Sequence, residues 1–198
     1  HEQSWRKQVS VGDLVLVCDV GGGTSDFSLI YVGENDGSLN LERVSVGEHL
    51  LLGGDNFDHL LAFYLKQRLE AQGASIDRWQ FLSLVGEVRE AKERFLSDSP
   101  PDSIKFSFAG KGASLFSNKT LSVELKKEEV HEKILGGFFP EVTQEELPST
   151  QQRSGFQDFG LKYEMETAIT KHLAAFLAQS LSVLKERSDF KLSPQLSE

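Results

Sequence analysis

The sequence predicts a mixed α/β fold for a chain of 198 residues. A continuous apolar run, Leu14–Cys18, and a second run, Phe27–Val32, flank a glycine-rich turn and are typical of adjacent strands. Apolar residues with helical spacing follow in three longer segments, 57–69, 78–96 and 163–187. Two short segments alternate apolar and polar residues, 104–108 and 121–125. Strands followed by helices and a second group of strands indicate an α/β or α+β domain.

The N-terminal strands are expected to form a three-stranded antiparallel meander. Residues 35–37 read Asn-Asp-Gly, which tolerates positive φ, and the apolar positions from Leu39 to Val46 predict a third strand after that turn. The first strand, Leu14–Cys18, is apolar without a break. We therefore expect it to be buried, with Cys18 filling space in the core.

Four helices are expected, because apolar segments with helical spacing are bounded by start or stop signals. They are a helix after Gly53 and Gly54 capped by Asp55 or Asn56, a helix over 78–96 stopped before Pro100, a helix beginning at Glu128 and Glu129 and closed by Pro140, and a helix over 163–187. Residues 141–160 have no apolar period and are typical of a loop.

Composition excludes several classes of function. The net charge of -9 argues against nucleic-acid binding, which needs clustered Lys and Arg. No apolar run approaches the roughly 20 residues that span a bilayer, so no membrane partner is expected. A single cysteine suits a reducing, cytoplasmic compartment. The sequence begins without Met or a signal-peptide pattern, so we expect a piece of a longer protein.

The most informative segment runs from Asp19 to Asp26 and reads Asp-Val-Gly-Gly-Gly-Thr-Ser-Asp. Three glycines let the backbone approach an anion, and successive N–H groups in such a turn form an anion site. Thr24 adds a hydroxyl group. Carboxylates beside phosphates make sense mainly with Mg²⁺ or an attacking water between them. A glycine-rich hairpin that uses Asp only for turn geometry explains the spacing equally well.

This segment resembles the second phosphate motif of the actin, sugar kinase and heat-shock ATPase superfamily. Within that superfamily, the triplet at 47–49 and the stretch Leu52–Asp58 are similar to the 70-kDa heat-shock chaperone family, in which a Leu-Gly-Gly-acid-Asp-Phe-Asp run begins a helix. Asn56 replaces the usual second acid. The spacing from Gly47 to Gly53 is one residue longer than usual.

A second resemblance lies on the helix predicted over 78–96. Glu90, Arg94 and Ser97 align with the chaperone helix whose side chains face the adenosine, and together with Glu93 they have the spacing of one helical face. Glu93 stands where the family has Lys, so a carboxylate replaces a cation. The chaperone resemblance covers about 14–142, and residues 160–163 and 168–173 resemble a divergent bacterial branch of the family.

The resemblance implies the second lobe of an actin-like ATPase with a ribonuclease H-like fold. Its inner subdomain would be 9–72 plus 126–187, its outer α+β subdomain 73–125, and its tails 1–8 and 188–198. The implied cofactor is ATP or ADP with Mg²⁺. The implied roles are catalysis by Asp19, Asp26 and Thr24, Mg²⁺ bound through water by Asp19 and Asp26, and nucleotide contacts from Gly21, Gly22, Gly23, Thr24, Gly53, Gly54, Glu90, Glu93, Arg94 and Ser97.

The resemblance also implies a parent protein that hydrolyses ATP as a stress-response chaperone. Its partners would be the first lobe, peptide clients, and a co-chaperone or nucleotide exchange factor. The sequence contains no Asp-x-Gly-Thr-Thr first phosphate turn and no terminal Gly-Gly strand, so we expect the chain alone to be inactive. Two alternatives stay open, a sugar or acid kinase lobe and an actin-like filament subunit.

Overall fold

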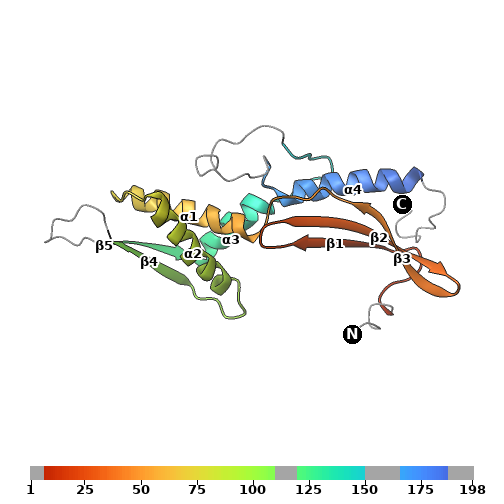
Figure 1. Cartoon of the computed structure of the whole chain (residues 1–198), viewed down its shortest axis with the longest axis horizontal. Coiled ribbons are helices and arrows are strands. Elements are labelled where there is room, and N and C mark those ends of the chain that lie inside the picture. Colours follow the sequence, from red (N-terminus) through yellow and green to blue (C-terminus); the bar gives the residue numbers. More distant parts are fainter. Residues whose placement is uncertain (1–6, 110–119, 150–165, 187–198) are drawn as a thin grey trace. The chain divides into compact units, whose positions relative to one another are not determined.

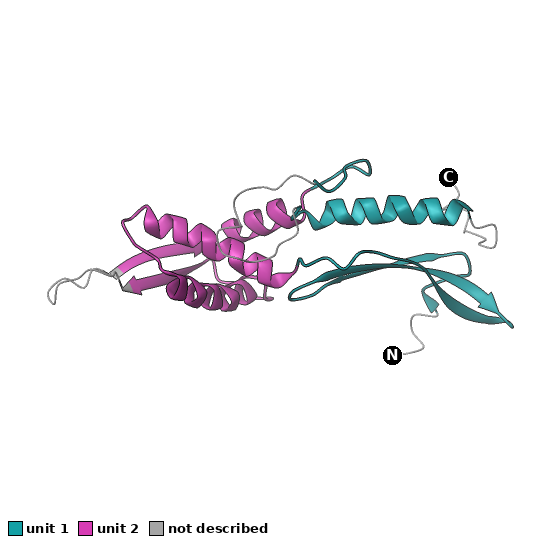
Figure 2. Cartoon of the chain, turned by 45° about the horizontal axis from the view of Figure 1, so that its top comes forward, with its two compact units in different colours: residues 1–52, 141–198 teal, residues 53–140 magenta. Residues whose placement is uncertain are grey.

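The computed structural model describes residues 7–109, 120–149 and 166–186. The chain divides into two compact units, residues 1–52 with 141–198 and residues 53–140 (Figure 2). The subdomain boundaries expected at 72 and 125 stay a prediction. Within the described segments, no helix combines the length and apolar character needed to cross a bilayer.

The first unit is built on an antiparallel sheet of order β1-β2-β3 (Figure 1). Its strands are β1 (Leu14–Val20), β2 (Ser25–Asn35) and β3 (Ser38–Val46), which confirms the predicted meander. Asp36 and Gly37 adopt left-handed conformations with φ of 50° and 75° in the turn between β2 and β3. Asp and Gly are residues that reach this region at low cost.

One face of this sheet is covered by α4 (Ile169–Glu186). The rings of Phe27 on β2 and Phe176 on α4 have centroids 5.8 Å apart. Buried residues alternate along the first part of β2, at Ser25, Phe27, Leu29 and Tyr31, and Val32 beyond them is also buried. Because successive side chains of a strand point to opposite faces, Asp26 projects from the face that α4 does not cover.

The last helix begins later than the predicted start at 163. Residues 163–165 lie outside the described residues, and 166–168 are not helical. The Glu166 carboxylate accepts a hydrogen bond from the Ala168 amide at 3.1 Å. A side chain that bonds its own neighbouring backbone competes with the helix, so α4 starts only at Ile169.

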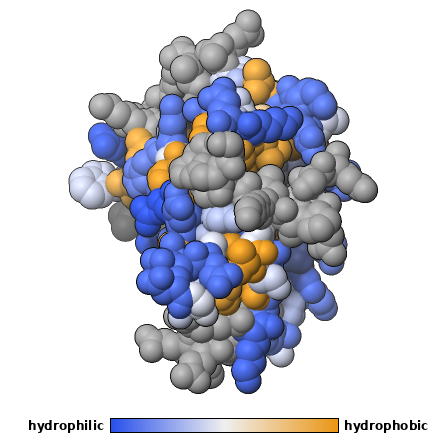
Figure 3. Space-filling view, turned by 90° about the vertical axis from the view of Figure 1, so that its right-hand side faces the viewer, coloured by the Kyte–Doolittle hydropathy of each residue, from blue (hydrophilic) through white to orange (hydrophobic). Residues whose placement is uncertain are grey.

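The prediction that β1 is buried, with Cys18 in the core, is wrong. Cys18 is exposed, and so are the apolar side chains of Leu16, Val17 and Val20. The reason is topological, since β1 is an edge strand and α4 packs against β2 and β3. Figure 3 shows that small groups of apolar side chains lie among hydrophilic ones on one face of the chain.

The second unit combines three helices with a two-stranded antiparallel sheet. Its elements are α1 (Gly54–Glu70), α2 (Arg78–Phe95), β4 (Ser103–Ala109), β5 (Thr120–Lys126) and α3 (Lys127–Phe138). These elements confirm the predicted helices and both alternating strands. The largest fully buried apolar side chains of this unit are Leu61, Leu65, Leu69, Leu84, Val88, Phe95, Leu125 and Val130.

The N-cap of α1 is Gly53, whereas the sequence favoured Asp55 or Asn56. The Gly53 amide donates to Asn56 Oδ1 at 2.8 Å, and the Asn56 amide donates to the Gly53 carbonyl at 3.0 Å. Asn56 therefore occupies the third helical position of a reciprocal capping arrangement. Its amide oxygen accepts this bond as a carboxylate does, so Asn in place of the family's acid keeps the helix start intact.

Candidate functional site

The glycine-rich turn lies at the end of the β1–β2 hairpin. Asp19 and Asp26 are direct partners in the register of these strands. Cross-strand partners share a face, so both carboxylates lie on the face opposite α4. The Gly21 amide donates to the Thr24 carbonyl at 2.7 Å and closes the loop. The structure thus brings the two predicted acidic residues together beside the turn.

The glycines of this turn are exposed, and their backbone conformation does not explain why they are glycines. Among the described residues the glycines with positive φ are Gly12, Gly37 and Gly73, which lie elsewhere. A Cβ at Gly22 would meet no atom within 4 Å, whereas one at Gly21 would lie 3.3 Å from the Thr24 carbonyl oxygen. The nearby Thr24 carbonyl therefore favours glycine at Gly21, whereas no contact within the turn requires glycine at Gly22.

His49 is a site residue that the sequence did not single out. Its Nδ1 lies 2.7 Å from Asp26 Oδ1, and because an ionised carboxylate only accepts, His49 is the donor. The side chains are 62% and 46% exposed. The two residues are 23 positions apart in the sequence, so no local pattern predicts this contact. The one available signal was that His49 belongs to the 47–49 triplet, which resembles the chaperone family.

The segment that carries His49 is fixed to β2 by several bonds. The hydroxyl of Ser25, which is fully buried, donates to the Leu52 carbonyl at 2.9 Å. The backbones of Ser25 and Leu50 exchange two hydrogen bonds of 3.0 and 3.1 Å. The Gly47 amide donates to the Phe27 carbonyl at 2.9 Å. These contacts hold His49 beside Asp26 through the backbone.

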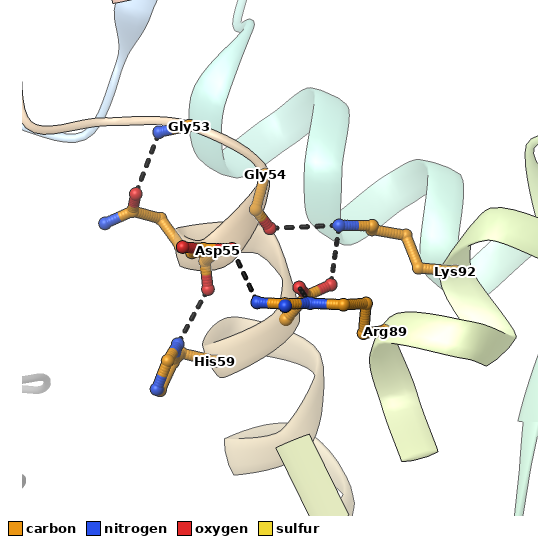
Figure 4. A network of polar contacts seen from close by, with 8 residues as sticks. Gly53, Gly54, Asp55, His59, Arg89 and Lys92 are labelled. Atoms are coloured by element: carbon orange, nitrogen blue, oxygen red, sulfur yellow. Dashed lines mark hydrogen bonds and ion pairs between the residues drawn. The ribbon is translucent and has the colours of Figure 1, made fainter. Parts of the chain in front are cut away.

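In the second unit, the predicted residues Gly53 and Gly54 lie at the start of α1 within a network of polar contacts (Figure 4). Two carboxylates of α1 pair with two cations of α2, and we call this set the Asp58 cluster. Its members are Asp55, Asp58, Arg89 and Lys92. None of these four was singled out as a functional residue, because the pairing depends on how α1 and α2 pack.

The predicted adenosine contacts lie on the exposed side of α2. Glu90, Glu93 and Arg94 are exposed. Ser97 follows the helix end, where its hydroxyl donates to the Arg94 carbonyl at 2.8 Å. Burial raises the pKa of the neighbouring Glu87, and the Glu90 carboxylate raises it further. This face of α2 is therefore rich in carboxylates, and its role toward adenosine stays a prediction.

The predicted site is divided between the two units. Asp19, Thr24 and Asp26 belong to the first, and the glycines of α1 and the residues of α2 belong to the second. Among the described residues, no group of three or more His, Cys, Asp or Glu side chains could hold a metal ion. Asp19 and Asp26 supply two carboxylates, and Mg²⁺ commonly binds proteins through one or two carboxylates and several waters.

Comparison with known proteins identifies the family. The family described as "Hsp70 protein" matches residues 6–144, which is more than half of the chain. The chain belongs to the Hsp70 family. Hsp70 proteins have an actin-like ATPase fold and bind ATP or ADP with Mg²⁺, so the kinase and filament alternatives are not favoured.

Among curated proteins, the chain is similar to "Chaperone protein HscA homolog" of Aliivibrio fischeri (strain MJ11), with 33% identity over 97 residues, 48% of this chain. "Chaperone protein HscA" of Shigella boydii serotype 18 is 34% identical over 97 residues, 49% of this chain. The homolog of Shewanella sediminis is 36% identical over 88 residues, 43% of this chain. The chain spans only 13% to 14% of the length of these relatives.

Proposed function

We propose that this chain is the second lobe of an Hsp70 nucleotide-binding domain and forms one side of an ATP cleft. The observation that supports it best is the pairing of Asp19 with Asp26 across the glycine turn, on the sheet face that α4 leaves uncovered. Two adjacent carboxylates repel each other unless a cation or water separates them. Beside three exposed glycines, such a pair suits Mg²⁺ with phosphates.

The residues present fit a nucleotide with its metal. In the proposed site, the amides of Gly21–Gly23 and the Thr24 hydroxyl bind phosphate oxygens. Asp19 and Asp26 would hold Mg²⁺ through water, and His49 would keep Asp26 in place. Gly53 and Gly54 contact the phosphates, while Glu90, Glu93, Arg94 and Ser97 contact the adenosine. Bound Mg²⁺ would neutralise charge on the phosphates during phosphoryl transfer.

The activity of the whole protein is part of the same proposal. We infer that the parent hydrolyses ATP in the cytoplasm as a stress-response chaperone, because the HscA relatives are chaperones. Hydrolysis would gate closure of this lobe on a first lobe outside this sequence. The remaining partners in this proposal are peptide clients and a co-chaperone or nucleotide exchange factor.

The chain alone should bind Mg-ATP weakly, with a Kd of about 1 mM or higher. Exposed amide hydrogen bonds compete with water and give only about 0.5 to 1.5 kcal/mol each. They must offset several kcal/mol of translational and rotational freedom lost on association. Calorimetric titration and a phosphate-release assay of this chain and of the longer protein test this. We expect binding and turnover only in the longer protein.

The matched variants are Asp19→Asn and Asp36→Asn. Both remove one exposed carboxylate from the same sheet, but Asp36 lies in the turn between β2 and β3, where Asn also accepts the left-handed conformation. We expect turnover of the longer protein to fall about 100-fold or more in Asp19→Asn and to stay unchanged in Asp36→Asn. Equal activity in both variants, or micromolar binding by the chain alone, would contradict the proposal.

A further inference from the structure

Lys92 is a buried lysine whose ammonium group contacts the predicted nucleotide turn. Its side chain is only 11% exposed, and Nζ donates to the Gly54 carbonyl at 3.0 Å (Figure 4). Lysines are almost never buried unless they are paired. Lys92 therefore holds a specific position, and one of its partners is the backbone of a residue that the family resemblance assigns to the nucleotide.

Its other partner is Asp58, whose side chain is 0% exposed. Lys92 Nζ lies 2.6 Å from Asp58 Oδ1, although this oxygen accepts no hydrogen bond of good geometry, so charge attraction dominates the contact. Arg89 Nε donates to Asp58 Oδ2 at 2.9 Å, and Arg89 Nη2 donates to Asp55 Oδ1 at 2.6 Å. The cluster ties the first two turns of α1 to α2.

The contact with Gly54 fixes more than one oxygen atom. The carbonyl of Gly54 and the amide N–H of Asp55 belong to one planar peptide group and point in opposite directions. A lysine that holds the oxygen therefore also sets the direction of the N–H. The Gly53 amide is held in turn by the Asn56 side chain. Both peptide groups at the start of α1 thus have set orientations.

We infer that Lys92, together with Asp58, is a positioning residue for nucleotide binding. It keeps the Gly53–Gly54 turn in a fixed position relative to α2, whose exposed face carries the predicted adenosine contacts. The inference rests on the proposed function, because it assigns the turn a nucleotide. If the role is purely structural, changes in the Asp58 cluster should alter the stability of the second unit and should not alter nucleotide affinity by any other route.

Two variants separate these roles. Lys92→Met leaves Asp58 with one cation, so part of any effect reflects lost stability. The double variant Asp58→Asn with Lys92→Met removes both buried charges, which is often nearly neutral for stability. Lys105→Met is the control, because Lys105 is exposed on β4 of the same unit.

The first measurement is amide hydrogen exchange by NMR on this chain without nucleotide. In the double variant we expect the Gly53 and Asn56 amides to exchange about tenfold faster, because the turn opens locally. The amide of Val130 in α3 should keep its rate, as should all amides in Lys105→Met. Unchanged exchange at Gly53 and Asn56 would overturn the inference, and equal acceleration at Val130 would show a purely structural role.

The second measurement is Mg-ADP affinity of the longer protein. We expect the double variant to bind about 10- to 100-fold more weakly at an unchanged melting temperature, since misplacement of about 1 Å has effects of that size. Wild-type affinity in the double variant would overturn the positioning role and leave the proposed function intact. If the wild-type protein does not bind Mg-ADP, the proposed function fails and the positioning role fails with it.

Discussion

The two predicted nucleotide turns, one in each unit, are held in different ways. The Gly53–Gly54 turn in the second unit is bonded to Lys92 and to Asn56, beside the buried carboxylate of Asp58. The Gly21–Gly23 turn in the first unit is exposed and is closed by one backbone hydrogen bond.

This difference shows which of the two turns is held by side chains. Buried polar contacts are strengthened by the low local dielectric, so the turn at α1 keeps its geometry without help. Exposed contacts compete with water and gain little. If the Gly21–Gly23 turn binds phosphate as proposed, its geometry depends on what covers it, which agrees with the proposal that another lobe completes the cleft. The predictions below test this comparison.

The largest effect is expected for Asp58→Ala in the second unit. It leaves the cations of Arg89 and Lys92 beside a cavity, and removing one partner of a buried ion pair costs about 3 to 5 kcal/mol. The matched change Asp26→Ala in the first unit should cost under about 1 kcal/mol, because that pair is exposed. Urea denaturation of both variants measures the free energies of unfolding. Similar losses in the two variants would contradict the comparison.

A smaller effect is expected for Glu166→Gln in the first unit. Glu166 is 2% exposed and accepts bonds from the Ala168 amide, Lys171 and the Ser149 amide. Burial raises its pKa, but these bonds together hold the pKa below its ordinary value of 4.5. Its contribution to stability is therefore present above the unfolded pKa and is lost as the pH falls through the lower folded pKa.

At pH 7 we expect Glu166→Gln to cost about 1 to 3 kcal/mol, since charged hydrogen bonds are lost. Below pH 4 the difference from the wild type should shrink, because protonation removes the same charge in the wild type. Denaturation curves at several pH values test this. Glu141→Gln, which changes an exposed residue of the same unit, should show no such pH dependence. A cost that stays constant down to pH 2 would refute the assignment.

Two glycines of the first unit offer a closer contrast. A Cβ at Gly47 would lie 3.2 Å from the Phe176 ring and 3.4 Å from Phe27 Cβ, so Gly47→Ala should cost about 1 to 2 kcal/mol. A Cβ at Gly22 would meet no atom within 4 Å. Gly22→Ala should leave the melting temperature within about 2 °C of the wild type and yet weaken Mg-ATP binding by the longer protein. An unaltered affinity would show that the turn does not contact phosphate.

Much of the fold could be predicted because its signals are local. The β2–β3 turn, the extents of α2 and α3, and the alternation in β4 and β5 all depend on residues close in sequence. The error at β1 has another cause. A continuous apolar run such as Leu14–Cys18 is typical of burial on both faces, but whether a second layer exists depends on elements that β1 itself does not specify.

In the candidate site, too, the contacts that depend on local sequence could be predicted and those that depend on packing could not. The Asp19–Asp26 pairing follows from a hairpin with a short turn, so the sequence could predict it. The Asp58 cluster could not be predicted, because it requires the packing angle of α1 on α2 to bring Arg89 and Lys92 to one carboxylate. The His49–Asp26 contact depends likewise on backbone bonds between β2 and the 47–52 segment.

The smallest effect on stability is expected for His49→Ala. The side chains of His49 and Asp26 are 62% and 46% exposed, so the change should alter the free energy of unfolding of this chain by under about 0.5 kcal/mol. In the longer protein the same change frees the Asp26 carboxylate to rotate, which should lower kcat for ATP hydrolysis about three- to tenfold with little change in KM. His49→Asn keeps an N–H donor at a similar place and should recover part of the loss. Single-turnover kinetics and urea denaturation of the three proteins give both quantities. A stability loss above about 1 kcal/mol would mean that this pair supports the fold. The contrast between the firmly held Gly53–Gly54 turn and the exposed Gly21–Gly23 turn would then be wrong.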